Sequence, residues 1–204
     1  MNGNAILSRI VLASASPRRL ELLRSLGLSV EVAPSGYDER ASADLTPSEL
    51  ATYHAGEKLR AALRNRAGHA NDVPVIAADT VVDLDGVALG KPGGADEAAG
   101  MLHALSGREH LVHTAFALAV PGGAAPIEER GTTHVRFYPL APAEIAEYVA
   151  TGEPFDKAGA YGIQGRAASL IEAIDGDFYT VMGLPLARVI RALRRSGFAL
   201  PKPN

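Results

Sequence analysis

The segment at residues 14–19 reads Ser-Ala-Ser-Pro-Arg-Arg and combines small hydroxyl side chains with two guanidinium groups. An apolar run precedes it and leucines at helical spacing follow it, so the segment is expected to begin a helix. The free N–H groups and partial positive charge of a helix N-terminus suit a phosphate, and arginine grips phosphate oxygens in forked geometry. Ser14, Arg18 and Arg19 therefore predict an anion site, although an ordinary capped helix with two exposed arginines fits these residues equally well.

Asp79 follows the apolar run 73–78, which predicts a central strand that ends at this carboxylate. Ligands of open α/β sheets collect beyond the carboxyl ends of strands. An ionised aspartate there could hold a divalent cation or accept a proton from water. An aspartate that caps its own turn is the alternative. Asp83 and Asp85 are better explained as turn and edge residues of a hairpin.

Two later segments could add polar groups to the same site. Lys91 stands between a glycine and a proline, so a rigid loop could present it to a phosphate, although a solvated loop lysine is also possible. Segment 151–165 carries four glycines among Asp, Lys, Tyr and Gln side chains. Such a composition suits a pocket wall better than a core, with a long irregular connection as the alternative.

Several kinds of chemistry are excluded by residues that the chain lacks. There is no cysteine, so disulfides, thiolate metal sites and cysteine nucleophiles are excluded. The six histidines form no HExxH pair, and there is neither a GxSxG elbow nor a GxxxxGK[ST] loop. These absences disfavour a zinc enzyme, a serine hydrolase and a P-loop ATPase.

The composition predicts a soluble cytoplasmic protein. Of the 204 residues, 47% are hydrophobic, which is ample for a core, and the net charge of -3 argues against a chain that coats nucleic acid or an anionic membrane. No apolar run approaches the ~18 residues of a membrane span, and no secretory signal is evident. We therefore expect no nucleic-acid and no membrane partner.

The alternation of elements predicts an α/β fold. Strands and helices alternate early, but hairpins intrude in the middle, so a mixed sheet is expected rather than a purely parallel one. The expected strands cover 10–14, 28–33, 73–78, 111–120 and 134–138, a hairpin over 80–89 turns at Asp85-Gly86, and the expected helices cover 17–26, 46–66, 95–105, 143–151 and 185–196.

The order of these motifs resembles the Maf family of nucleotide pyrophosphatases along nearly the whole chain. The matching stretches are LASASPRRLELL at 12–23, AADTVV at 77–82, LGKP at 89–92, LSGREHLVHT at 105–114, TGEPFDKAGAYGIQG at 151–165 and GLPL at 183–186. The resemblance implies a fold related to the inosine-triphosphate pyrophosphatases: an elongated mixed sheet flanked by helices, forming two lobes around a cleft. It also implies that residues 1–204 make a single domain with those two lobes.

Within that family the EPFDKAGAYGIQG stretch looks like the branch that acts on dTTP and UTP. The resemblance implies metal-assisted hydrolysis of the α–β phosphoanhydride to a monophosphate and pyrophosphate, with Mg²⁺ or Mn²⁺ as the cofactor. A homodimer is a further expectation. The alternatives are a pyrophosphatase for another nucleotide, such as a modified purine, and a nucleotide-binding regulator of cell division.

The roles of family residues carry over by motif. Asp79 matches the catalytic proton acceptor and would also bind the metal, with Glu39 as a second metal ligand. The positions tied to substrate choice are Arg18, Thr80 and Gln164. The positions expected around the phosphates are Ser14, Arg19, Lys58 and Lys91. Gln164 alone cannot specify the base, because its amide could serve uracil, thymine or, flipped, cytosine.

Overall fold

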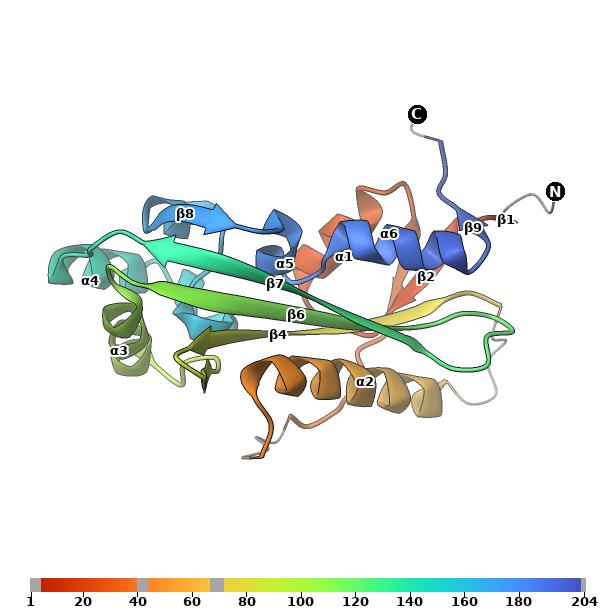
Figure 1. Cartoon of the computed structure of the whole chain (residues 1–204), viewed down its shortest axis with the longest axis horizontal. Helices are drawn as coiled ribbons and strands as arrows, with labels where there is room; N and C mark the ends of the chain where they lie inside the picture. Colours follow the sequence, from red (N-terminus) through yellow and green to blue (C-terminus); the bar gives the residue numbers. More distant parts are fainter. Residues whose placement is uncertain (1–4, 40–43, 67–71, 203–204) are drawn as a thin grey trace.

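A computed structural model describes residues 5–39, 44–66 and 72–202 of the chain. It shows an elongated mixed sheet flanked by helices (Figure 1). The strands are β1 (Ala5–Ile6), β2 (Arg9–Leu12), β3 (Ser29–Val32), β4 (Val75–Leu84), β5 (Val87–Leu89), β6 (Glu109–Ala119), β7 (Ile127–Phe137), β8 (Ile171–Asp175) and β9 (Phe198–Ala199). The α-helices are α1 (Pro17–Arg24), α2 (Pro47–Asn65), α3 (Ala95–Leu105), α4 (Pro142–Ala150), α5 (Phe178–Met182) and α6 (Leu186–Arg195).

The main sheet has seven strands in the order β3-β2-β4-β6-β7-β8, with β5 paired to β4 beside that path. The pairs β2–β3 and β2–β4 are parallel, whereas β4–β6, β6–β7 and β7–β8 are antiparallel. The short strands β1 and β9 pair with each other near the two ends of the chain. The predicted elongated mixed α/β sheet is therefore confirmed.

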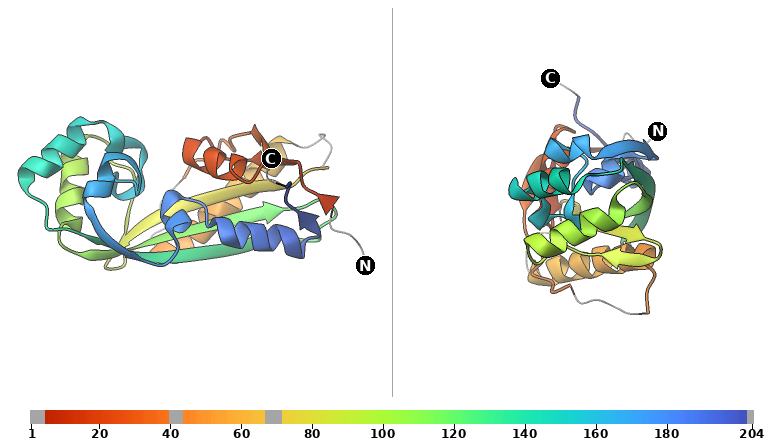
Figure 2. Two further views of the ribbon diagram at one scale, coloured as in Figure 1. Left: turned by 90° about the horizontal axis from the view of Figure 1, so that it is seen from above. Right: turned by 90° about the vertical axis from the view of Figure 1, so that its left-hand side faces the viewer.

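The helices pack in two groups along the long axis of the molecule (Figure 2). Around one half of the sheet, α2 covers one face through a small-residue core, and α1 and α6 cover the opposite face. Around the other half, α3 and α4 pack on a separate cluster that includes Phe137 and Tyr161. The long strands β4, β6 and β7 run through both halves and join them.

The start of α2 shows why its limits could be predicted closely. Thr46 accepts a hydrogen bond from the backbone N–H of Glu49, and the Glu49 carboxylate accepts one from the backbone N–H of Thr46. This reciprocal capping box, followed by Pro47 at the first helical position, fixes where the helix begins. The predicted helix over 46–66 is confirmed to within one residue at each end.

The prediction that a strand ends before Asp79 is wrong. Strand β4 continues through Asp79 and Thr80 to Leu84, and both Asp79 and Thr80 have a backbone partner on β6. The polar pair is tolerated inside a buried strand because both side chains find polar partners far away in the sequence. The predicted hairpin turn is confirmed, since Asp85 and Gly86 both have positive φ.

Other boundaries also differ from the sequence-based expectation. Strand β7 begins at Ile127 rather than at 134, because three of its inward-facing residues, Glu129, Gly131 and Thr133, are not apolar and hide the alternation expected of a strand. Strand β8 and the short helix α5 were not predicted at all. Segment 151–165 contains no α-helix or strand; it contains the 3-10 turns η1 (Glu153–Asp156) and η2 (Ala158–Ala160), and a third turn, η3 (Gly165–Ser169), begins at its end.

Candidate active site

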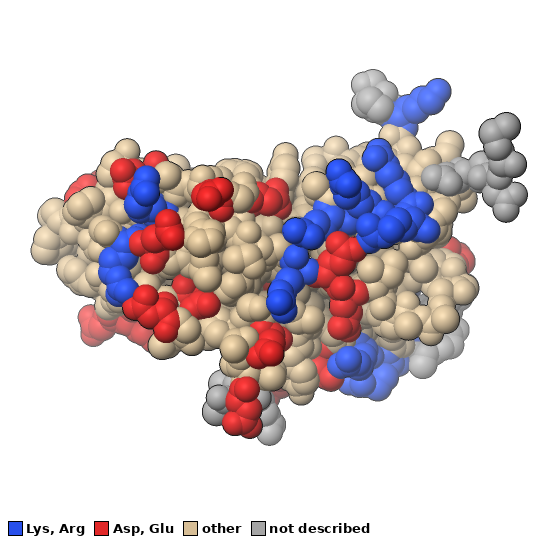
Figure 3. Space-filling model, in the orientation of Figure 1, with Lys and Arg blue, Asp and Glu red and all other residues tan. Residues whose placement is uncertain are grey.

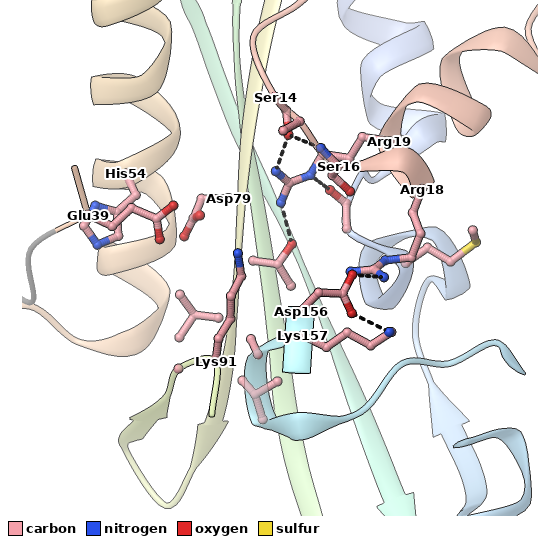
Figure 4. Close-up of a pocket in the computed structure, with 18 of the residues that line it drawn as sticks. Ser14, Ser16, Arg18, Arg19, Glu39, His54, Asp79, Lys91, Asp156 and Lys157 are labelled. Carbon is pink, nitrogen blue, oxygen red and sulfur yellow. Dashed lines mark hydrogen bonds and ion pairs between the residues drawn. The ribbon is translucent and has the colours of Figure 1, made fainter. Parts of the chain in front are cut away.

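A cleft of about 660 Å³ lies where β4 lacks a strand partner on one side (Figure 4). In the described part of the chain, β2 pairs with β4 at Val75 and Ile76, and β5 pairs with it only from Val82 onward. Residues 77–81 therefore have a strand partner on the β6 side alone. The side chains of Asp79 and Thr80 point to opposite faces of the strand, yet both line the cleft because it opens at this free edge.

Every residue predicted to act at the site lines this one cleft. Residues more than 100 positions apart in the chain thus meet around a single space. The set comprises Ser14, Arg18, Arg19, Glu39, Lys58, Asp79, Thr80, Lys91 and Gln164.

The carboxylates of Asp79 and Glu39 converge on the ammonium group of Lys58. The Lys58 Nζ lies 2.5 Å from Asp79 Oδ1 and 2.6 Å from Glu39 Oε1. Asp79 is only 5% exposed, so its charge needs this partner. Partial burial acts to raise the pKa of Glu39, but the hydrogen bond and charge of Lys58, aided by Lys91 and His54, bring that pKa below its ordinary value. Glu39 is therefore ionised at neutral pH.

Arg19 connects three separate elements at the opposite side of the cleft. Its Nη1 donates to Ser14 Oγ at 3.1 Å, its Nη2 to Thr80 Oγ1 at 3.1 Å, and its Nε to the carbonyl oxygen of Gly183 at 2.8 Å. Burial lowers the pKa of this guanidinium, although the nearby Asp79 acts to raise it. Arginine nevertheless stays charged in proteins, so Arg19 is a fixed cation whose orientation is set by these three acceptors.

A chain of hydroxyl groups continues from Arg19 into the core. Thr114 Oγ1 donates to the carbonyl oxygen of Thr180 at 2.6 Å and lies 2.9 Å from Thr80 Oγ1. A hydroxyl has one proton, so the proton between the two threonines must come from Thr80. Thr80 thus accepts from Arg19 and donates to Thr114, and its hydroxyl proton points away from the cleft.

The N-terminus of α1 faces the cleft without a side-chain cap. Its N-cap residue, Ser16, makes no capping hydrogen bond, and the first turn contains no acidic residue. The backbone N–H of Ser16 instead donates to Ser14 Oγ at 3.2 Å. The orphan N–H groups and the two arginines together form an electropositive corner suited to phosphate.

Arg18 reaches across the cleft to the irregular wall formed by residues 151–165. Its Nη1 lies 3.2 Å from Asp156 Oδ2, and Lys157 Nζ lies 2.6 Å from Asp156 Oδ1 (Figure 4). Burial acts to raise the pKa of Asp156, but its contacts with Lys157 and Arg18 lower that pKa overall. The expectation that this segment forms a pocket wall is confirmed, since residues 156–158 and 161–164 line the cleft.

Lys91 and Gln164 lie on the exposed rim. Lys91 follows β5 and its ammonium group points into the cleft towards Asp79 (Figure 4). Gln164 immediately precedes η3 and is exposed, and no hydrogen bond of its side chain is recorded among the described residues. Both side chains are therefore available to a ligand.

Sequence reasoning missed His54 and Tyr37, which also line the cleft. His54 is buried, and its Nδ1 lies 3.2 Å from the Tyr37 hydroxyl. His54 precedes Lys58 by four residues on α2, so the two side chains share a face of the helix. That spacing was a usable signal, and it would have placed His54 beside the predicted phosphate-binding lysine.

The wall of the cleft depends on a glycine in a left-handed conformation. Gly159 has φ +66°, and an added Cβ would lie 3.0 Å from both γ-carbons of Val82. We expect Gly159→Ala to lower the free energy of unfolding by about 1–3 kcal/mol, because it combines backbone strain with a close contact. Gly36 has the same φ of +66°, but no atom lies within 4 Å of the added Cβ. Gly36→Ala therefore adds the backbone strain without the close contact. Urea unfolding should show a larger loss for Gly159→Ala, and equal losses would contradict this assignment.

A buried histidine beneath the wall predicts a pH dependence of stability. His110 Nε2 lies 2.6 Å from the Tyr161 hydroxyl, and burial lowers the pKa of His110 from 6.5 to about 4. The unfolded chain therefore binds a proton that the folded chain rejects, so stability is lost as pH falls from 6.5 to about 4. At 1.36 kcal/mol per pH unit this interval corresponds to a loss of about 3 kcal/mol. In urea unfolding between pH 4 and 7, His110→Phe should flatten the profile and the exposed control His134→Asn should not.

Basic side chains also gather outside the cleft, over α6 (Figure 3). This helix has no acidic residue and exposes Arg188, Arg191, Arg194 and Arg195. These arginines are not among the described residues that line the cleft. In a chain of net charge -3 they concentrate positive potential on the half of the molecule that carries α1.

Comparison with known proteins gives matches over nearly the whole chain. The family model described as Maf-like protein matches residues 9–196. A dTTP/UTP pyrophosphatase of Pelotomaculum thermopropionicum is 45% identical over 192 residues, covering 94% of this chain and 98% of the relative. One of Thermus thermophilus is 48% identical over 190 residues, covering 93% and 95%. Among solved structures, the Staphylococcus aureus Ham1 protein aligns with a TM-score of 0.49 at 15% identity, covering 89% of this chain and 98% of that one.

Proposed function

Because this chain belongs to the Maf family, we propose that it is a nucleoside triphosphate pyrophosphatase that hydrolyses dTTP and UTP to the monophosphate and pyrophosphate. The observation that carries the proposal is the convergence of a buried carboxylate, Asp79, with fixed cations around one cleft. A volume of about 660 Å³ lies within the usual range of small-molecule sites. A small nucleotide would fit this space, with the two groups of helices on either side of it.

The reaction needs the negative field of the triphosphate to be neutralised before water can attack. The water oxygen bonds to the α-phosphorus, the bond between the α-phosphorus and the oxygen that bridges it to the β-phosphate breaks, and that oxygen leaves with pyrophosphate and the electron pair. Arg19 and the uncapped N-terminus of α1 would hold phosphate oxygens, since both are fixed before the ligand arrives. Lys91 would approach from the opposite rim and neutralise the leaving group.

Asp79 would act on the attacking water. Its side chain is 7% exposed, so its carboxylate is shielded from bulk solvent yet lines the cleft. A carboxylate in this position would orient the water and accept its proton as the new P–O bond forms. The hydrogen bond from Lys58 holds this carboxylate in position.

The acidic pair also fits a divalent cation. Asp79 and Glu39 can reach one point between them, since both contact the same nitrogen atom, and carboxylate oxygens are the ligands that Mg²⁺ and Mn²⁺ prefer. The described residues contain no cluster of three or more His, Asp or Glu, so substrate phosphates and water would supply the remaining ligands, as is common for Mg²⁺. When bound, the cation would neutralise phosphate charge and lower the pKa of a coordinated water.

Base selection would depend on the opposite end of the cleft. Gln164 lies on the rim with Ile163 and Met182 nearby in the lining, so a flat base can contact apolar side chains while the amide meets its polar edge. Arg18 and Thr80 would influence substrate choice by positioning other residues of the site. Arg18 contacts Asp156, and Thr80 accepts a hydrogen bond from Arg19. Residues 162–164 add backbone groups that could discriminate between uracil and cytosine.

Pyrophosphate release measured across nucleoside triphosphates, with and without Mg²⁺ or Mn²⁺, tests the proposal. We expect turnover of dTTP and UTP in the presence of a divalent cation and much slower turnover of CTP and purine nucleotides. Preference for a modified purine, or binding of dTTP without turnover, would instead support another substrate or a regulatory role.

The location, the oligomeric state and the partners of the protein remain predictions. None of the helices in the described part of the chain combines the length and the hydropathy that a membrane span requires. The cytoplasmic location, the homodimer and the absence of a nucleic-acid partner are expectations from the sequence, and size-exclusion chromatography with light scattering would test the dimer.

A further inference from the structure

Lys58 occupies the place between the two carboxylates where the cation would sit. We propose that Lys58 is an internal counter-cation that closes the Asp79–Glu39 pair to a free divalent cation, and that it moves to the phosphates when the cation arrives bound to the nucleotide. This inference rests on the proposed function, because it concerns how the same site is filled.

The contacts of Lys58 show the competition directly. Its Nζ lies 2.5 Å from Asp79 and 2.6 Å from Glu39, so one ammonium already bridges both acidic groups and offsets half of their charge. The Lys58 side chain is only 12% exposed, and a dication beside it would be repelled at short range in a partly desolvated site. A free cation must therefore displace Lys58 before it gains two good ligands.

A free cation would gain little free energy by displacing Lys58 from the two carboxylates. Among the described residues no third His, Asp or Glu completes a metal cluster at the pair, so the free cation would keep most of its water. The displaced ammonium would also lose both of its carboxylate partners. A triphosphate changes this balance, because its oxygens can bind the cation and accept the lysine at the same time.

Lys58 is able to move, unlike Arg19. Arg19 is held by three acceptors, whereas Lys58 has a flexible four-carbon stem. Its backbone lies in the middle of α2, which packs on the sheet through Ala51, Ala55 and Leu59. The side chain can therefore swing while the helix stays in place, which reconciles the predicted role of Lys58 at the phosphates with its observed contact with the carboxylates.

Mn²⁺ binding followed by electron paramagnetic resonance, without nucleotide, tests the inference. The wild-type protein should bind Mn²⁺ weakly, and Lys58→Met should bind it about 5- to 150-fold more tightly, the usual range for coupling between two ligands. Adding Glu39→Gln to Lys58→Met should remove most of the gain. Lys91→Met is the matched control: it removes a lysine that points into the same cleft but bridges no acidic pair, and should change Mn²⁺ affinity no more than a few-fold.

Loss of Lys58 could destabilise the fold, because Asp79 would be left buried without its partner. Lys58→Gln is the second variant, since its amide removes the charge and can still donate a hydrogen bond. For both variants, millimolar Mn²⁺ should raise the melting temperature, and for the wild-type protein it should not. Tight Mn²⁺ binding by the wild-type protein without nucleotide would overturn the inference. An unchanged Mn²⁺ affinity in both variants would also overturn it.

A second arm separates this inference from the proposed function. A non-hydrolysable UTP analogue with an α,β-imido bridge should make the wild-type protein bind Mn²⁺ tightly. If the analogue does not bind and neither dTTP nor UTP is hydrolysed, the proposed function fails, while the nucleotide-free titrations still decide the role of Lys58. If hydrolysis is normal but Lys58→Met and Lys58→Gln gain no affinity for Mn²⁺, only the inference fails.

Discussion

Asp79→Asn is expected to lower kcat for dTTP and UTP by about 10²–10⁴-fold, the usual contribution of a positioned proton acceptor. The amide keeps the size of the side chain but cannot accept the proton of the attacking water. It would also weaken the acidic pair, since of the two carboxylates that contact Lys58 in the described part of the chain Glu39 alone would remain. Steady-state assays of pyrophosphate release give the measurement.

The matched control is Asp83→Asn, four residues further along the same face of β4. Asp83 is also buried, accepts from the backbone N–H of Gly86 at 2.7 Å and lies 3.1 Å from His113 Nε2. It is not among the described residues that line the cleft, so its variant should lose stability and keep kcat within a few-fold. A folded Asp79→Asn protein with normal turnover would show that the chemistry has been assigned to the wrong group.

The course of β4 illustrates what local sequence patterns could not reveal. The apolar run up to residue 78 correctly predicts a buried strand, but Asp79 and Thr80 read as its end because polar residues are costly in a core. Their partners, Lys58 and Arg19, lie 21 and 61 residues away. No local pattern contains that information, so the strand could not be extended through the polar pair from sequence alone.

The length of strand β7 was underestimated for a different reason. Its first half reads as polar because Glu129 and Thr133 are polar although they face inward, and Gly131 lowers its apparent β propensity. The structure explains that glycine: a Cβ there would lie 2.4 Å from Thr180 Oγ1. The close approach of α5 to the sheet requires glycine, and α5 itself was not predicted.

The sequence predicted which residues form the candidate site, but it predicted only part of how they are arranged in space. Motif resemblance named nine residues that line the cleft, although it missed His54 and Tyr37, and the Ser14–Arg19 turn follows from helix-capping rules alone. The ion pair of Arg18 with Asp156 joins residues 138 positions apart, and the Lys58 bridge depends on how α2 packs against β4. Such contacts follow from tertiary packing, which the order of motifs does not specify.

Arg19→Lys is expected to lower kcat/KM by about 10²–10³-fold, the usual cost of removing a preorganised donor. Lysine has one nitrogen where arginine has three, so Ser14 Oγ, Thr80 Oγ1 and the Gly183 carbonyl cannot all keep their donor. Leaving such partly buried acceptors unpaired should also lower the free energy of unfolding by about 1–3 kcal/mol. Arg24→Lys, at the exposed far end of α1, is the control and should change neither quantity.

Thr80→Val tests whether Arg19 acts through the hydroxyl chain or by its charge alone. Valine removes the acceptor for Arg19 Nη2 and the donor to Thr114 in one step while keeping the shape of the side chain. If the chain holds Arg19 in position, the losses of kcat/KM in Arg19→Lys and Thr80→Val should be strongly non-additive in the double variant, because either change already frees the cation. Additive losses would mean that the two residues contact the substrate independently. In that case the guanidinium would contribute through its charge, and its three fixed hydrogen bonds would serve stability alone.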